Sequence, residues 1–97
     1  MAVVVVTRFK GNHDYRSHIR EGAAILKRHG ATTVRAGRCL AGEFAGQLTV
    51  VATLPDLAAF GKYAQALLAD PEWQRFLAET AKTFELQDRS ITVAEDF

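Results

Sequence analysis

The feature that most constrains this chain is the order in which strand-like and helix-like apolar patterns follow one another. Val3 to Phe9 is a β-branched run, continuously apolar at first, which is typical of a buried strand. The next apolar residues, Tyr15, Ile19, Ala23 and Leu26, recur at spacings of three and four and share one stripe of a helix. The first third of the chain therefore predicts a strand followed by an amphipathic helix.

The middle of the chain predicts a hairpin. Gly30 suits the left-handed position that ends a helix. Thr32 to Leu40 then has the composition of a strand, in which Gly37 indicates a bulge or a close contact. The glycine-punctuated segment 41–46 predicts a turn, and Gln47 to Thr53 follows as a second strand. Because the connection is short, the two strands are expected to pair antiparallel.

The last part of the chain predicts a broken helical arm and a final strand. Thr53-Leu54-Pro55-Asp56 predicts a helix start, with a capping box and the proline in the first turn. Asp70-Pro71 interrupts the helix because the residue before a proline is pushed out of helical conformations. Asp70 can then cap a second helix that begins at Pro71. Glu85 to Val93 closes the chain as a strand of mixed polarity.

The resulting order, β-α-β-β-α-β, predicts an α+β fold. We expect a ferredoxin-like sandwich, with a four-stranded antiparallel sheet and both helical segments on one of its faces. The length of 97 residues suits one domain, spanning 1–97. The strands leave the uncovered face of the sheet rich in valine and threonine and poor in charge. We therefore expect two sheets to pack face to face in a homodimer, the alternative being a monomer with a threonine-rich solvated face.

Charge and composition exclude several classes of function. The net charge is +1 and no basic patch is present, so we expect no nucleic-acid partner. No apolar run approaches the roughly 20 residues of a membrane helix, and we expect no membrane partner. Cys39 is the single cysteine, which excludes an internal disulfide and a multi-cysteine zinc site. With no secretion signal in the sequence, we expect a cytoplasmic protein.

The sequence contains no known catalytic, phosphate-binding or calcium-binding motif. Each candidate catalytic residue is therefore considered individually. His18 can act as a general base, since a histidine titrates near neutrality; the alternative is a histidine at the helix surface. His29 lies eleven residues further along the same helix, about 16 Å away, so the two cannot share a metal ion. We expect no metal site. Cys39 is expected to act as a small hydrophobe rather than a nucleophile.

Three stretches of the chain carry a resemblance to known proteins. Leu67-Leu68-Ala69-Asp70-Pro71-Glu72-Trp73-Gln74-Arg75-Phe76 resembles the A-L-x-x-D-P-E-W arm of NIPSNAP-like domains. The segment 53–60 resembles their strand-to-helix junction, and Arg28-His29-Gly30-Ala31 resembles their helix end. The chain is thus similar to the dimeric α/β-barrel superfamily, which includes the antibiotic-biosynthesis-type monooxygenases. The resemblance implies a fold and a dimer, but no single activity, because the superfamily carries many.

The resemblance also implies a pocket between the helices and the sheet, where the break at Asp70-Pro71 loosens the packing. We expect His18 and Tyr63 to assist proton transfer there. The expected ligand-binding residues are Tyr15, Arg35, Phe60, Trp73 and Phe76. For Arg35 two alternatives stay open, namely a place in the dimer interface and an ion pair with an acidic residue of the last strand.

Two functions of different classes follow. The first is an enzyme with cofactor-independent monooxygenase-like or isomerase-like chemistry, acting on a small aromatic or polyketide-like compound. The alternative is a non-catalytic ligand-binding or structural dimeric module. Some relatives bind haem, for which His18 would be the axial ligand, but we expect no cofactor. An enclosed pocket with a histidine or tyrosine pointing into it favours the enzyme, and a solid core excludes it.

Overall fold

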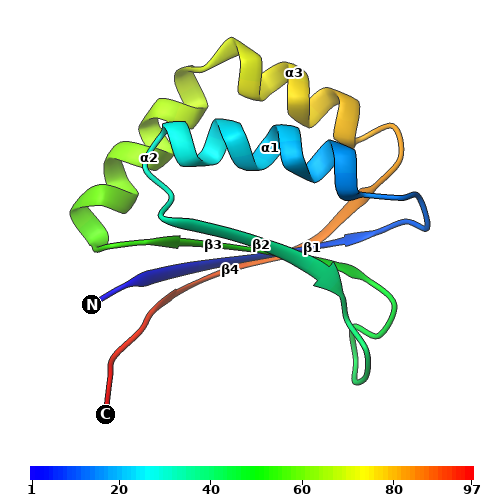
Figure 1. The fold of residues 1–97 in the computed structure, drawn as a ribbon, viewed down its shortest axis with the longest axis horizontal. Helices are drawn as coiled ribbons and strands as arrows, with labels where there is room; N and C mark the ends of the chain where they lie inside the picture. The colour runs from blue at the N-terminus through cyan, green and yellow to red at the C-terminus, as the bar shows by residue number, and fades with distance from the viewer.

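The computed structural model describes residues 1–97 and confirms the expected order of elements. The strands are β1 (Val3–Lys10), β2 (Thr33–Arg38), β3 (Leu48–Leu54) and β4 (Glu85–Val93), and the helices are α1 (Arg16–Arg28), α2 (Leu57–Ala69) and α3 (Pro71–Thr80). The strands form one antiparallel sheet in the order β2-β3-β1-β4, and all three helices lie over the same face of it (Figure 1). This is the ferredoxin-like α+β sandwich that the element order predicts.

The helix ends follow from local sequence signals, with one exception. Gly30, which follows the C-cap residue His29 of α1, has φ +119°, and Asp70 caps α3 by accepting the N–H of Glu72 at 2.9 Å, as predicted. The predicted start of α2 is wrong. Asp56 caps α2 by accepting the N–H of Ala59 at 2.8 Å, and Pro55 precedes this cap instead of entering the first turn. Thr53 forms no capping box because it is still paired within β3.

The sheet has one register shift, and it does not lie at Gly37, where the sequence predicts a bulge or a close contact. Gly37 pairs with Thr49 in uninterrupted register, and nothing lies within 4 Å of the place where a Cβ would stand. The predicted bulge or close contact at Gly37 is therefore wrong. The register shifts instead between Arg8 and Phe9, where β1 runs along β4. A glycine in a strand is a weak signal for a bulge, because the pairing of the neighbouring strand decides where an extra residue fits.

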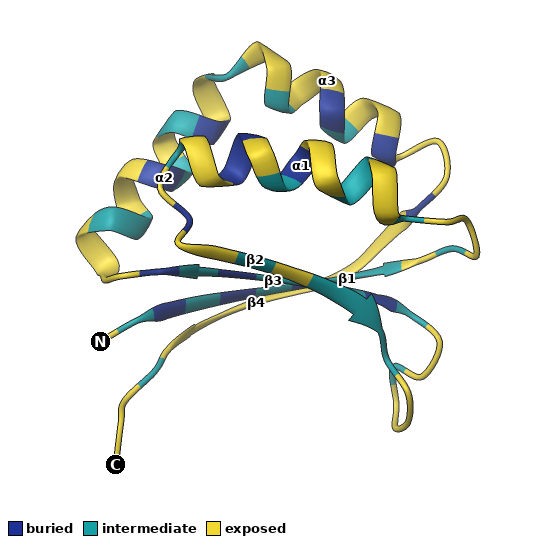
Figure 2. Ribbon diagram, viewed as in Figure 1, coloured by how far each residue is buried: buried dark blue, intermediate teal, exposed yellow.

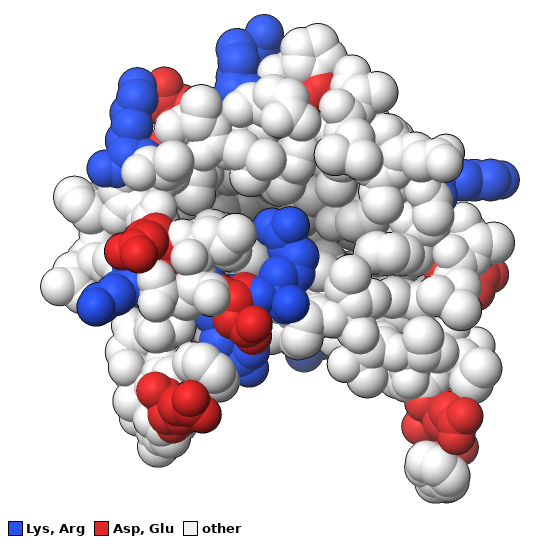
Figure 3. Space-filling view, turned by 180° about the vertical axis from the view of Figure 1, so that it is seen from behind, with Lys and Arg blue, Asp and Glu red and all other residues white.

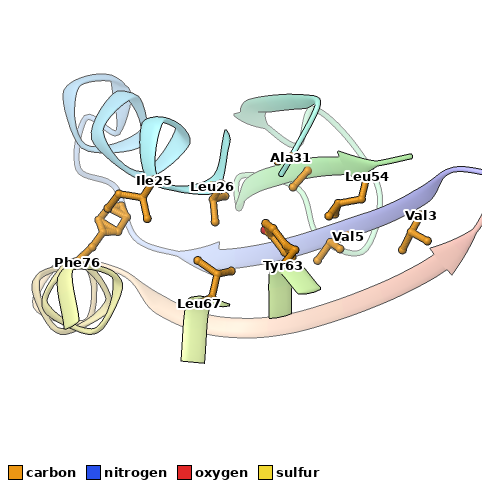
Figure 4. Packing of buried hydrophobic residues seen from close by; sticks show 10 residues of the cluster. Val3, Val5, Ile25, Leu26, Ala31, Leu54, Tyr63, Leu67 and Phe76 are labelled. Atoms are coloured by element: carbon orange, nitrogen blue, oxygen red, sulfur yellow. The ribbon is translucent and has the colours of Figure 1, made fainter. Parts of the chain in front are cut away.

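The hydrophobic core lies between the helices and the sheet, because alternate side chains of β1 and β3 point toward the helices. The sheet contributes Val3, Val5, Ala52 and Leu54 to the core cluster, and Ala31 comes from the loop before β2. The helices contribute Ile25 and Leu26 from α1, Tyr63 and Leu67 from α2, and Phe76 from α3. Figure 4 shows it extending from Ile25 and Phe76 at one end to Leu54 and Val3 at the other, with Tyr63 and Leu67 between. Strand β4 is exposed along its whole length (Figure 2).

The opposite face of the sheet carries no helix (Figure 1), and we refer to it as the uncovered face. By the alternation of the strands it presents Val4, Val6 and Val51, which are only half-buried. At its edge the Arg8 guanidinium lies 3.2 Å from the Asp88 carboxylate and 4.3 Å from the centre of the Phe44 ring. The centre of this face is thus apolar. None of the three helices is long and apolar enough to cross a membrane.

Candidate ligand cavity

A cavity of about 420 Å³ lies between the helices and the sheet. This volume falls in the range of about 300–1,000 Å³ that is usual for small-molecule sites. Figure 3 shows that the molecule is hollowed on the side facing away from the viewer in Figure 1, with Lys and Arg atoms beside the hollow. Most residues that line the cavity are hydrophobic, and none is Asp or Glu. The cavity therefore suits a largely apolar ligand.

Aromatic side chains of α2 and α3 form one wall of the cavity. The rings of Trp73 and Phe76 are 5.3 Å apart, and those of Phe60 and Tyr63 are 6.2 Å apart. Phe76 comes so close to α1 that a Cβ on Gly22 would stand 2.5 Å from its Cζ atom. The absence of a side chain at Gly22 thus allows α3 to approach α1 and sets the position of the wall. Such rings offer flat apolar faces on which an aromatic ligand can stack.

His18 is held on two sides at the cavity. Its ring stacks on Phe76 at 4.3 Å with an interplanar angle of 23°. Its Nε2 atom lies 2.6 Å from Oγ1 of Thr80, and this oxygen lies 2.9 Å from the Phe76 carbonyl oxygen. A carbonyl can only accept, so the Thr80 hydroxyl donates to it and accepts from Nε2–H of His18. We therefore assign the tautomer with the proton on Nε2, which leaves Nδ1 as the basic atom.

Tyr63 supplies a protonated hydroxyl. Its side chain is buried in the core cluster and also lines the cavity, and its hydroxyl makes no hydrogen bond within the chain. Burial raises the pKa of Tyr63, and this effect outweighs the lowering of the pKa by the charge of Arg89. Tyr63 is thus a hydrogen-bond donor at neutral pH rather than a base.

Arg89 and Thr80 are cavity residues that the sequence reasoning did not select. Arg89 lies on β4, and its Nε donates to Oγ1 of the buried Thr7 at 3.3 Å. The sequence does indicate the direction of the Arg89 side chain. Residues two apart in a strand point to the same face of the sheet, and Ile91, an apolar residue, also lines the cavity. Thr80 follows Trp73 and Phe76 at helical spacing, but nothing in the sequence pairs it with His18 across 62 residues.

The structure brings five of the seven predicted site residues to the cavity. These are His18, Phe60, Tyr63, Trp73 and Phe76. Tyr15 does not line it, and its ring instead lies 5.6 Å from the guanidinium of Arg38 at the start of α1. Arg35 lies opposite Val51 on the uncovered face, in the edge strand furthest from β4, so it cannot pair with an acidic residue of the last strand. Tyr15 and Arg35 therefore have no part in the ligand site proposed below.

The remaining histidines and the cysteine lie outside the cavity. His29 follows α1, and its Nε2 lies 2.6 Å from the Asp70 carboxylate at the junction of α2 and α3. Cys39 is half-buried, and its thiol donates to the Ala41 carbonyl at 3.2 Å. No three His, Cys, Asp or Glu side chains come together in a way that could hold a metal ion.

Comparisons with known proteins agree with the fold. Residues 4–93 match the model of a family described as a domain of unknown function (DUF6854). No curated protein matches the chain. One similar solved structure is SnoaB, a cofactor-independent oxygenase from Streptomyces nogalater, with a TM-score of 0.73 and 18% identity over 99% of this chain and 95% of that chain.

Two further similar structures are NIPSNAP proteins. A NIPSNAP-like domain protein from Burkholderia xenovorans has a TM-score of 0.72 and 19% identity, over 99% of this chain and 87% of that chain. Protein Atu4242 from Agrobacterium tumefaciens, a NIPSNAP family protein with unknown function, has a TM-score of 0.74 and 18% identity, over 100% of this chain and 96% of that chain. The predicted resemblance is thus confirmed at the level of the fold, which is all that such low identities carry.

Proposed function

Since the chain belongs to the family described as a domain of unknown function (DUF6854), and that description names no activity, we propose a function from the cavity itself. The cavity binds a small aromatic or polyketide-like compound, and His18 removes a proton from it. The observation that carries the proposal is that His18, with Nε2 occupied by Thr80, lines the same largely apolar cavity as the protonated hydroxyl of Tyr63. A base and a hydrogen-bond donor at one ligand site are the minimum for general acid–base catalysis.

The chemistry begins with the transfer of an acidic C–H proton of the ligand to Nδ1 of His18. Tyr63 donates a hydrogen bond to the ligand oxygen on which negative charge develops, in surroundings with little water. Return of the proton to a different carbon gives an isomer. Reaction of the carbanion with O₂ gives a hydroperoxide, which loses water to leave a ketone, so that a CH₂ group and O₂ become C=O and H₂O. The likeness to SnoaB, a cofactor-independent oxygenase, supports the second outcome through the fold.

The alternative function is ligand binding without catalysis. It is favoured by the way in which His18 is held, because a stacked ring with a hydrogen bond to Thr80 is also how a structural histidine satisfies itself inside a protein. The two functions differ in one respect that can be measured. The enzyme exchanges a ligand proton with solvent, whereas the binding protein holds the ligand unchanged.

The test is deuterium exchange at an acidic carbon. We choose 1,8-dihydroxyanthrone, a three-ring compound whose methylene protons are acidic because the carbanion is delocalised. In D₂O without oxygen, the protein is expected to accelerate the loss of the methylene NMR signal, and His18→Gln is expected to lower this acceleration by about 100-fold. Oxygen uptake in air then separates oxygenation from isomerisation. Binding of the compound without accelerated exchange would leave the non-catalytic function in place of the enzyme.

We further propose that two copies pack their uncovered faces together as a homodimer. The support is the apolar centre formed by Val4, Val6 and Val51. Arg8 and Asp88 already neutralise each other at the edge of this face. Arg35 has no ion pair within the chain, but it is exposed on the edge strand β2, where its guanidinium can stay in water when a second sheet approaches. The cavity lies on the other side of the sheet, and each copy would keep its own. A cytoplasmic location stays a prediction.

A further inference from the structure

We propose that the ligand of this cavity is an anion, and that Arg89 binds its negatively charged oxygen atoms, with an aromatic carboxylate as the best-fitting class. This inference rests on the proposed function, because it assigns a chemical class to the compound that the same cavity binds. It adds a residue that determines specificity and lies outside the proton-transfer pair of His18 and Tyr63.

The charge balance of the cavity is the first argument. Arg89 lines a cavity in which no residue is Asp or Glu. None of the ion pairs of the chain involves Arg89, whereas Arg8 and Arg28 both lie within 4 Å of a carboxylate. Arg89 is itself exposed to solvent, so water screens its attraction for an anion until a bound ligand covers the guanidinium. The protein supplies no such anion, so a ligand that carries one is favoured.

The geometry of the guanidinium is the second argument. Its Nε donates to Oγ1 of Thr7, which is buried in the central strand β1. This hydrogen bond restrains the plane of the guanidinium, and no other hydrogen bond within the chain engages its two terminal nitrogens. Two parallel N–H groups match the two oxygens of a carboxylate, a fit that a lysine cannot offer.

The relationship between Arg89 and Tyr63 is the third argument. Burial raises the pKa of the Tyr63 phenol, while the charge of Arg89 lowers it to a smaller extent, and the Tyr63 hydroxyl has no partner within the chain. Both residues line the same cavity, so one ligand can place its carboxylate at Arg89 and the oxygen that gains charge in the reaction at Tyr63. The rings of Trp73 and Phe76 in the same cavity offer the flat surface on which the aromatic part would lie.

The experiment compares a charged ligand with a neutral ligand of nearly the same shape. Binding of 2-naphthoate and 2-naphthamide is measured by isothermal titration calorimetry for the unmodified protein, for Arg89→Gln and for Arg75→Gln. Arg75 is an exposed arginine of α3 that does not line the cavity, so its variant is the matched control. We expect the unmodified protein and the control to bind the naphthoate about 10- to 100-fold more tightly than the amide. Arg89→Gln is expected to abolish this preference.

The outcomes separate the inference from the proposed function. Equal binding of acid and amide by the unmodified protein would overturn the anion site and leave the ligand cavity in place. Binding of neither compound would count against both. A preference for the acid that persists in Arg89→Gln would overturn the role of Arg89. Thermal unfolding without ligand gives an independent check. The midpoint of Arg89→Gln is expected to fall only slightly, because Arg89 has no charged partner and loses only its hydrogen bond to Thr7. A marked fall would show that Arg89 is structural.

Discussion

The Nε2 atom of His18 lies 2.6 Å from Oγ1 of Thr80 and thereby joins the beginning of α1 to the end of α3. Thr80 is buried, and its hydroxyl proton is directed to the Phe76 carbonyl, so it can only accept from the histidine. The contact fixes both the orientation of the ring and the nitrogen that carries the proton. A base that is already oriented needs less reorganisation when the ligand reacts.

Thr80→Val tests this contact, because valine keeps the shape of threonine and removes the acceptor. Ligand affinity is expected to be unchanged, while the rate of deuterium exchange falls about 10-fold as His18 loses its preferred tautomer. The lost hydrogen bonds are expected to lower the free energy of unfolding by about 1 kcal/mol. Thr80→Ser restores the hydroxyl and is expected to restore exchange. Equal exchange rates in the valine and serine variants would show that Thr80 does not position the base.

Gly22→Ala tests the packing of α3 on α1. The added methyl group would stand 2.5 Å from Cζ of Phe76, inside van der Waals contact. We expect the free energy of unfolding, measured with urea, to fall by about 1–3 kcal/mol. Gly61→Ala is the matched control, because nothing lies within 4 Å of a Cβ at that position of α2. It is expected to stabilise the protein by about 0.5–1 kcal/mol. Stabilisation by both substitutions would mean that Phe76 can move aside freely.

The contact between Asp70 and His29 predicts a dependence of stability on pH. The hydrogen bond from His29 is the largest cause that lowers the pKa of Asp70 below its ordinary value. The unfolded chain therefore binds a proton at a higher pH than the folded chain does. The stabilisation by Asp70 is present above the ordinary pKa of an aspartate, about 3.9, and is lost as the pH falls from there through the folded pKa.

Asp70→Asn separates this charge from the helix cap, because asparagine and aspartate cap helices about equally well. The variant is expected to be less stable than the unmodified protein at pH 7 and at pH 5, and the difference is expected to shrink toward pH 2 in urea unfolding. Asp56→Asn is the control, since Asp56 caps α2 without a basic partner. A loss of stability in Asp70→Asn that is the same at every pH would contradict the role of the charge.

Val4→Glu tests the dimer. Val4 is half-buried on the uncovered face, between Thr53 and Thr92 of the neighbouring strands, so a glutamate there would bring two unpaired charges into the interface between two sheets. We expect sedimentation to give the mass of a dimer for the unmodified protein and of a monomer for Val4→Glu. Gln65→Glu adds the same charge to an exposed position of α2 and is expected to remain dimeric. A monomeric mass for the unmodified protein would refute the homodimer.

Local signals in the sequence predicted much of the fold. The break at Asp70 followed from the restriction that Pro71 places on its predecessor, and that restriction acts within two residues. The start of α2 was misjudged because three residues, Thr53, Pro55 and Asp56, offered competing helix starts. Pairing in β3 holds Thr53 in the sheet and decides among them.

The site was harder to predict than the fold because it depends on distant residues. The five aromatic and histidine residues at the cavity were predicted from their residue types and from the resemblance to folds with a pocket between the helices and the sheet. Arg89 is a candidate for ligand binding because no carboxylate of the protein lines the cavity beside it. Thr80 is a candidate for positioning the base because it contacts a histidine 62 residues away. Neither relationship is contained in a sequence window. A cavity volume is likewise the sum of many packing distances, and no single residue indicates it.

The most direct test of the ligand cavity is the position of a bound ligand in solution. Intermolecular NOEs are measured between the aromatic protons of 2-naphthoate and methyl groups of the protein. The cavity predicts NOEs to Val50, Leu67 and Ile91, which line it. It predicts none to Val4 and Val51, which lie on the uncovered face. NOEs confined to Val4 and Val51 would contradict the account, because the ligand would then occupy the face assigned to the dimer.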